Sequence, residues 1–251
     1  MSRNWYLYIL PMLMLLPVFV FRDFTTDNEL RYISIIEEAL RDGSLFAFHN
    51  HGVAYADKPP LYFWFAMLFR LIAGDNYIWL LGALTVVPAI VIMRVMNRWC
   101  FGAEEYATRV APPMLALLTC VMFLGGTVVL RMDMMMTMFI VLALYSFWKL
   151  YTGTGRAHER FLLPLWIFLA VFSKGAVGIL MPVVVIASFL ATEGKIKSIG
   201  RYMGWRFWGV IVLFAAAWFA AVYAEGGAEY LDNLLFKQTV GRGVNSFDHK
   251  E

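Results

Sequence analysis

Long apolar blocks separated by short polar stretches dominate the pattern of residues along the chain. The blocks occupy residues 5–22, 59–73, 77–96, 110–130, 133–151, 161–173, 175–192 and 207–223. A helix needs about 20 predominantly apolar residues to cross a bilayer, and most of the blocks approach that length. The pattern therefore predicts an all-α fold, a polytopic bundle of transmembrane helices.

The composition supports a membrane protein. Hydrophobic residues make up 61% of the 251 positions and charged residues 16%, whereas an ordinary soluble domain is roughly 45–50% apolar. A soluble core of this size cannot bury so much apolar surface. The net charge of +3 is small and gives no indication of nucleic-acid binding. Cys100 and Cys120 are expected to be buried apolar residues rather than part of a disulfide or zinc site.

Basic residues mark three of the loops between the blocks. These loops carry Arg94, Arg98 and Arg109; Lys149, Arg156 and Arg160; and Lys195, Lys197, Arg201 and Arg206. Cytoplasmic loops are enriched in lysine and arginine. If all three loops are cytoplasmic, block 59–73 cannot cross the membrane. This block begins with two prolines, contains Arg70 and is rich in aromatic residues, so we expect it to lie in the membrane interface.

The resulting topology has about seven spans and a cytoplasmic N-terminus. Residues 1–223 form the transmembrane domain, and residues 224–251 form an extracytoplasmic tail or the start of a further part of the protein. The first extracytoplasmic loop, residues 23–76, carries two juxtamembrane helices, which we expect at 29–42 and 59–73.

The polar residues that are hardest to explain as ordinary helix-surface residues all fall on the outer face of this topology. This face comprises the first outer loop, the turn at Arg131 to Asp133, the turn at Lys174 and the tail. The arrangement requires two spans in residues 161–192, because one long helix there would place the basic stretch 195–206 outside, against the charge rule. The sequence thus predicts a functional site on the outer face.

The first outer loop offers candidate ligands for an anion. Thr26 and Glu29 have the spacing of a capping box, so Glu29 either starts a helix or takes part in chemistry. A helix N-terminus facing out of the membrane also favours anions. Arg31 is either a solvated surface residue or the donor of two parallel hydrogen bonds to a phosphate. Lys58 either extends to the lipid headgroups or binds a phosphate as a point charge.

Two further ionisable residues lie at the boundaries of apolar blocks. Asp133 begins one block, and Lys174 stands between two others, a position in which an ionisable residue is a functional candidate. Basic side chains beside carboxylates suit transfer from a lipid-linked phosphate. The cations stabilise the leaving phosphate, and a carboxylate accepts the proton of the incoming hydroxyl group.

No cofactor is assigned from these residues. Asp57 either orients Lys58 or joins a site for a divalent cation. His49 and His51 are expected to be polar loop residues, because two histidines without a third ligand are a weak signal for a metal site.

Four segments of the chain, "DNELRY", "GVAYADKPPLYFW", "RMD" and "SKGAVG", resemble the bacterial lipid-phosphate-sugar transferases of the GT-C superfamily. The resemblance is strongest to the branch that holds the lipid A aminoarabinose transferases and the protein O-mannosyltransferase-like enzymes. It runs over essentially the whole chain, and the Tyr-x-(Asp/Glu)-Lys-Pro-Pro segment is its most specific part.

The resemblance implies a multi-pass enzyme of the bacterial inner membrane whose active site faces the periplasm. Such enzymes transfer a sugar from a polyprenyl-phosphate donor to lipid A, another glycan or a protein, and invert the anomeric carbon. The implied acids are Asp27 or Glu29 as the base and Asp133 as a second acid on the outer face. The resemblance assigns the donor phosphate to Lys58 and Arg31. Tyr55, Asp57 and Lys174 complete the candidate substrate-binding residues.

The chain departs from the family pattern in two ways. Aligned on Arg31 and Tyr32, Asn28 stands where the family commonly has aspartate. Asparagine cannot act as a base, so Asp27 or Glu29 takes that role, and we favour Asp27. Family enzymes also continue well beyond this length, so we expect either a fragment or a catalytic half that needs a second chain.

A non-catalytic lipid-phosphate-binding or transporter subunit is the alternative function. A transporter is expected to place ionisable residues near the middle of the membrane in broken helices. Here nearly all the candidates fall on one face, which favours the enzyme.

Overall fold

The computed structural model describes residues 6–21, 23–24, 26–105 and 112–235. Within these ranges the chain is helical except for turns, loops and one short antiparallel hairpin, in which β1 (His49–Asn50) pairs with β2 (Val53–Ala54). The predicted all-α fold is confirmed for this part of the chain.

The helices follow the apolar blocks closely. The first half contains α1 (Tyr6–Leu13), α2 (Leu16–Phe21), η1 (Thr26–Leu30), α3 (Arg31–Asp42), α4 (Leu61–Ala73), η2 (Gly74–Asn76), α5 (Tyr77–Leu81) and α6 (Ala83–Glu105). The second half contains α7 (Pro112–Thr119), α8 (Val121–Val128), α9 (Asp133–Tyr151), α10 (Glu159–Lys174), α11 (Val177–Thr192), η3 (Ile196–Ser198), α12 (Ile199–Tyr202) and α13 (Trp205–Asp232).

In the part of the chain that the structure describes, three helical segments are long and apolar enough to cross a membrane: Ala83–Phe101, Asp133–Tyr151 and Trp205–Leu235. Leu61–Ala73 and Val177–Thr192 are shorter apolar helices. Some predicted spans are interrupted: block 110–130 contains two short helices that meet at Cys120, whose backbone is extended. The expected count of seven spans therefore stays a prediction. Cys100 and Cys120 are both exposed, so the expectation that they are buried was wrong.

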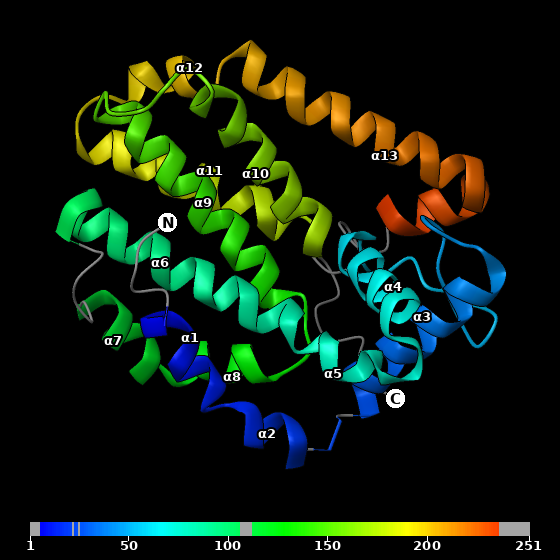
Figure 1. The fold of residues 1–251 in the computed structure, drawn as a ribbon. Coiled ribbons are helices and arrows are strands. Elements are labelled where there is room, and N and C mark those ends of the chain that lie inside the picture. The colour runs from blue at the N-terminus through cyan, green and yellow to red at the C-terminus, as the bar shows by residue number, and fades with distance from the viewer. Residues whose placement is uncertain (1–5, 22, 25, 106–111, 236–251) are drawn as a thin grey trace.

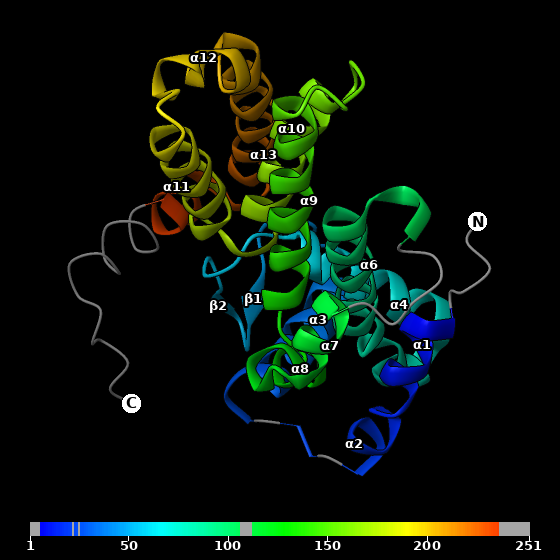
Figure 2. The ribbon, with the colours of Figure 1, turned by 90° about the vertical axis from the view of Figure 1, so that its left-hand side faces the viewer.

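Helix α9 lies at the centre of the bundle. It packs against α6, α10 and α11, and α10 in turn packs against α13 (Figures 1 and 2). Because α9 and α10 are antiparallel neighbours, the first residue of α9 lies beside the last residue of α10. This pairing brings Asp133 and Lys174 to the same end of the bundle.

The outer loop forms a packed layer at that end. The apolar face of α3 is buried through Tyr32, Ile35 and Ile36, and α3 packs against α4. The ring of Trp64 on α4 meets Phe172 on α10 edge to face, at 5.2 Å between centroids. Both expected loop helices thus exist, although their position relative to a bilayer stays a prediction.

Two glycines shape the boundaries of this layer. Gly43 ends α3, as expected, in the left-handed conformation with φ of 72°, a conformation that glycine adopts without a steric penalty. Gly227 has φ of 73° and ψ of −175° inside α13 and marks a kink there. Beyond the kink, the helix turns towards α3 and the hairpin (Figure 1). The predicted end of the last apolar block at residue 223 is therefore not the end of the helix.

We expect Gly227→Ala to destabilise the fold by about 1–3 kcal/mol, because this backbone conformation is essentially restricted to glycine. Gly209→Ala in the same helix is the matched control. A Cβ at Gly209 has no atom within 4 Å, and alanine is favoured over glycine in a helix by roughly 1 kcal/mol. Thermal unfolding in detergent should show a lower Tm for the first variant only. Equal effects of the two variants would contradict the proposed role of the kink.

Candidate functional site

An ion pair joins α9 to α10 at the end of the bundle that faces the outer loop. The Nζ of Lys174 donates to Oδ1 of Asp133. Asp133 also lies 3.7 Å from Nε of Arg131 through its other carboxylate oxygen. The side chain of Arg131 is 48% exposed, so its guanidinium can still reach a ligand. Two of the predicted site residues are thus in direct contact, and Arg131 joins them.

A second polar group lies just before α4. The Nζ of Lys58 donates to Oδ2 of Asp57 at 2.9 Å, and the hydroxyl of Tyr55 approaches the same oxygen at 3.4 Å. The Lys58 side chain is only 12% exposed, so its ammonium group is held close to the protein. Pro59 and Pro60 follow, and α4 begins after them, where the missing N–H of proline carries no penalty. Asp57 and Lys58 are thus in direct contact, and the choice between an orienting role for Asp57 and a role in a cation site stays a prediction.

Tyr32 connects the two polar groups. Its ring is buried in α3 and lies 5.8 Å from the ring of Tyr62. Burial raises the pKa of the Tyr32 hydroxyl, the positive charge of Arg131 opposes this shift, and the carboxylates of Asp57 and Asp133 add to it. The hydroxyl therefore stays protonated at neutral pH. Charged side chains from both polar groups therefore lie close enough to the Tyr32 hydroxyl to influence its pKa.

Arg31 belongs to the same neighbourhood. It is the first residue of α3 and is exposed. Its charge lowers the pKa of both Tyr32 and Tyr55. The net pKa shift of Tyr55 is nevertheless upwards, mainly because of burial and then because of Asp57. Arg31 is therefore a cation on the open side of the cluster.

Glu29 is buried and attached to the turn that precedes α9. It is 1% exposed, and its Oε1 accepts a hydrogen bond of 2.7 Å from the backbone N–H of Leu130. The carboxylate thereby holds the turn that presents Arg131 and Asp133. Asp27 lies in the π-helical turn η1, but its side chain lies outside the part that the structure describes.

The kinked end of α13 holds the outer loop in place. Oε1 of Glu225 accepts hydrogen bonds from the backbone N–H groups of Leu45, Phe46 and Ala47, at 2.8, 3.0 and 2.9 Å. These contacts fix the chain immediately before the hairpin. A Cβ built on Gly226 would lie 2.9 Å from Cβ of Ala47, so the close approach requires glycine.

Tyr230 extends this attachment to the predicted site. Its hydroxyl accepts the N–H of Phe48 at 3.0 Å and donates to the carbonyl oxygen of Tyr55 at 2.8 Å. Tyr230 thus fixes the backbone two residues before Asp57. The sequence carries no local signal for this role, because Tyr230 and Tyr55 are 175 residues apart. Arg131, by contrast, stands in the turn that the topology placed on the outer face.

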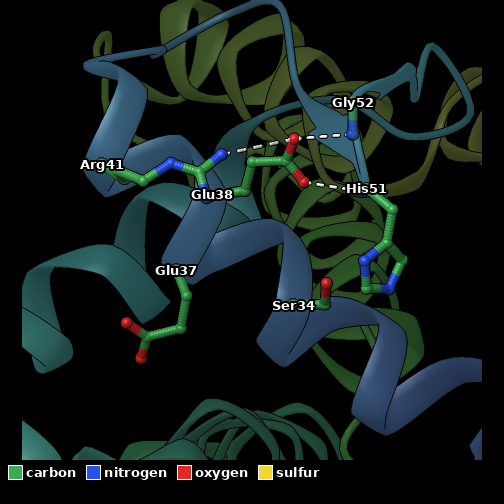
Figure 3. Close-up of a pocket in the computed structure, with 6 residues that line it drawn as sticks. All are labelled: Ser34, Glu37, Glu38, Arg41, His51 and Gly52. Atoms are coloured by element: carbon green, nitrogen blue, oxygen red, sulfur yellow. Dashed lines mark hydrogen bonds and ion pairs between the residues drawn. The ribbon is translucent and has the colours of Figure 1, made fainter.

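A separate hollow lies on the other side of α3. It has a volume of 610 Å³ and is lined by Ser34, Glu37, Glu38, Arg41, His51 and Gly52 (Figure 3). The Glu38 carboxylate accepts the N–H groups of His51 and Gly52 at 2.7 and 2.8 Å. This carboxylate is therefore occupied in holding the hairpin. In the ranges that the structure describes, no three metal-binding side chains come together.

The fold is shared with a GT-C glycosyltransferase of known structure. The crystal structure of ArnT from Cupriavidus metallidurans bound to undecaprenyl phosphate superimposes with a TM-score of 0.76 at 19% identity, covering 92% of this chain and 44% of that one. The apo structure of the same protein gives a TM-score of 0.70 at 20% identity, covering 91% and 43%.

Curated relatives carry a more particular name, undecaprenyl phosphate-α-4-amino-4-deoxy-L-arabinose arabinosyl transferase. The relative from Enterobacter sp. (strain 638) is 28% identical over 77% of this chain and 34% of its own length. A relative from Pseudomonas fluorescens is 24% identical over 90% of this chain and 42% of its own. No family model matches the chain.

The resemblance predicted from the motifs is confirmed by both comparisons. The chain spans only about a third to two fifths of the length of these curated relatives. The relatives and the apolar helices together identify a membrane protein.

We expect Tyr230→Phe to lower stability by about 1–3 kcal/mol, because it leaves the N–H of Phe48 and the carbonyl of Tyr55 without their partner. Tyr223→Phe is the control, since Tyr223 lies on the same helix and is exposed. Thermal unfolding in detergent measures both variants. A Tm for Tyr230→Phe that equals that of the control would show that the attachment carries no stability.

Proposed function

We propose that the chain forms the donor-binding and catalytic part of an integral-membrane glycosyltransferase that uses a polyprenyl-phosphate sugar. The single observation that carries the proposal is the convergence of Arg31, Lys58, Arg131 and Lys174 with carboxylates at one end of the bundle. The names of the relatives support an undecaprenyl-phosphate aminoarabinose donor. The acceptor is lipid A, another glycan or a protein.

The cations have different parts in this proposal. Arg31 and Arg131 are exposed, so they are placed to contact the donor phosphate with parallel hydrogen bonds. Lys58 adds a point charge that Asp57 holds in position. Lys174 neutralises Asp133 and so keeps that carboxylate from repelling the phosphate. Positive charge aimed at the phosphate stabilises it as it leaves.

The reaction breaks the bond between the anomeric carbon of the sugar and the phosphate oxygen. A bond forms between the same carbon and the acceptor oxygen on the opposite face, and the proton of the acceptor hydroxyl passes to a carboxylate. Undecaprenyl phosphate leaves with the bonding electrons. The carboxylates of Glu29 and Asp133 are engaged by Leu130 and Lys174, which supports Asp27 as the base.

Asp57 has an oxygen shared by Lys58 and Tyr55, which supports its orienting role over that of a ligand to a divalent cation.

The distribution of basic residues supports the proposed orientation of the protein in the membrane. Basic residues from α6, α9, the start of α10, η3 and α12 gather at the end away from the site, as expected for a cytoplasmic face. This distribution supports a site on the periplasmic side of the bacterial inner membrane.

A lipid-phosphate-binding unit without catalysis is the second candidate. Asn28 at the position of the family's aspartate favours it. The partial coverage of the relatives is also compatible with a second chain or a further segment that completes the acceptor site. Both candidate functions require the phosphate-binding side chains, but only the glycosyltransferase turns over a polyprenyl-phosphate sugar.

Binding of undecaprenyl phosphate to the protein in nanodiscs tests the phosphate site. Lys58→Ala should weaken binding at least about tenfold, because a hydrogen bond to a charged group is worth roughly 1.5–3 kcal/mol. Arg31→Gln, at an exposed position, should weaken it as well. Arg70→Ala is the matched control on α4, since Arg70 pairs with Glu37 and Asp75 instead. Equal affinities for all four proteins would contradict the proposed site.

Release of undecaprenyl phosphate from an undecaprenyl-phosphate sugar tests the base. Asp27→Asn should reduce turnover at least about a hundredfold, within the range for a lost general base, and leave donor binding intact. Glu29→Gln keeps an oxygen that can accept the Leu130 N–H and should retain most of the activity. A larger loss of turnover in Glu29→Gln than in Asp27→Asn would identify Glu29 as the base. Donor binding without turnover in any variant or the unaltered protein would favour the non-catalytic unit.

A further inference from the structure

A small cavity lies between α6, α9 and α10 at the end of the bundle away from the candidate site. Its volume is 230 Å³, which corresponds to the space of about eight water molecules and so to a lipid headgroup rather than acyl chains. Its lining includes Arg94 and Arg98 from α6, Lys149 from α9, and Glu159, Leu162 and Trp166 from α10. One part of the lining is thus basic and another part is apolar.

The basic part of the lining is open to a ligand. Arg94 and Arg98 are one helical turn apart on α6, a spacing that puts them on the same face, and both are exposed. Among the residues that the structure describes, neither guanidinium forms an ion pair with a carboxylate. Lys149 differs, because its ammonium group pairs with Glu159 and lies 4.7 Å from the ring centroid of Tyr145.

Glu159 gives the cavity a second chemical requirement. It lies in the first turn of α10 and is 4% exposed. Its Oε1 pairs with Lys149, whereas its buried Oε2 has no hydrogen-bond partner in the described ranges. Leaving a buried carboxylate oxygen without a donor is unfavourable. A ligand that fits this cavity therefore needs a hydrogen-bond donor as well as an anionic group.

We propose that this cavity binds the headgroup of an anionic phospholipid of the phosphatidylglycerol type. The phosphodiester meets the guanidinium groups of Arg94 and Arg98, whose fork geometry suits phosphate oxygens. A glycerol hydroxyl donates to Oε2 of Glu159. The apolar lining, with Leu162 and Trp166, lies where the acyl chains leave the cavity. With three cations and one carboxylate, the lining favours an anionic headgroup over a zwitterionic one.

The position in the bundle supports a lipid rather than a soluble anion. Basic pockets between transmembrane helices on the cytoplasmic side are sites for anionic headgroups, and the lysines and arginines of the neighbouring loops lie at this end. The proposal goes beyond the glycosyltransferase function. Lipid binding in this cavity requires neither a sugar donor nor an intact base, so its test is independent of the proposed glycosyltransferase function.

Native mass spectrometry of the delipidated protein in detergent, with phosphatidylglycerol added, provides the test. Arg94→Gln combined with Arg98→Gln should weaken lipid binding about tenfold or more, because the double variant loses two of the three cations that line the cavity and basic residues near a membrane surface attract anionic lipids. Lys197→Gln combined with Arg201→Gln is the matched control. It removes two exposed cations at the same end but outside the cavity, and binding should be unchanged.

Three lipids and inorganic phosphate, all tested on the unaltered protein, keep the proposal open to refutation even if the double variant does not fold. Phosphatidylglycerol should bind more tightly than phosphatidylethanolamine, which is zwitterionic, and than phosphatidylmethanol, which has the phosphodiester but no headgroup donor. Inorganic phosphate at millimolar concentration should not displace it. Equal binding of the three lipids, displacement by free phosphate, or equal losses in the two double variants would overturn the proposal.

Discussion

The outer layer of this protein depends on one carboxylate that satisfies three successive backbone N–H groups. Residues 45–47 leave α3 without entering a helix or a strand, so their N–H groups need partners from elsewhere in the fold. Glu225 supplies a single oxygen to all three. Tyr230 continues the same attachment to Phe48 and Tyr55. The end of α13 therefore fixes the backbone position of the irregular segment that leads to Lys58.

The rest of the candidate site follows from the pairing of α9 with α10. Their antiparallel packing brings an acid at a helix start next to a base at a helix end, where each charge is also favoured by the helix dipole. Glu29 then links the turn before α9 to η1. Segments that are far apart in sequence thus bring charged side chains close to Tyr32.

Sequence reasoning predicted the features that depend on local pattern. The apolar blocks located most of the helices, Gly43 marked the end of α3, and the charged segment before α4 was recognised as a site candidate because charge beside apolar sequence is unusual. The contact of Asp57 with Lys58 follows from their adjacency in the chain. The sequence also located the turn that contains Arg131, although it did not single out that side chain.

Features that depend on tertiary packing could not be predicted in this way. Nothing near Glu225 or Tyr230 indicates a partner about 180 residues earlier. Glu29 had the spacing of a helix cap, and its observed contact with Leu130 across 101 residues is visible only in the fold. The break at Cys120 and the exposure of both cysteines likewise reflect packing that hydropathy does not encode.

The attachment by α13 has a consequence for biosynthesis. A membrane protein emerges from the ribosome in chain order, and its early segments can fold before later ones exist. Residues 45–55 emerge long before Glu225 and Tyr230, so the first outer loop has to wait for the last described helix before its backbone is satisfied. Contacts of such long sequence separation form late, because closing the intervening chain is entropically unfavourable. The loop that carries Lys58 is thus expected to reach its final conformation only once α13 is synthesised.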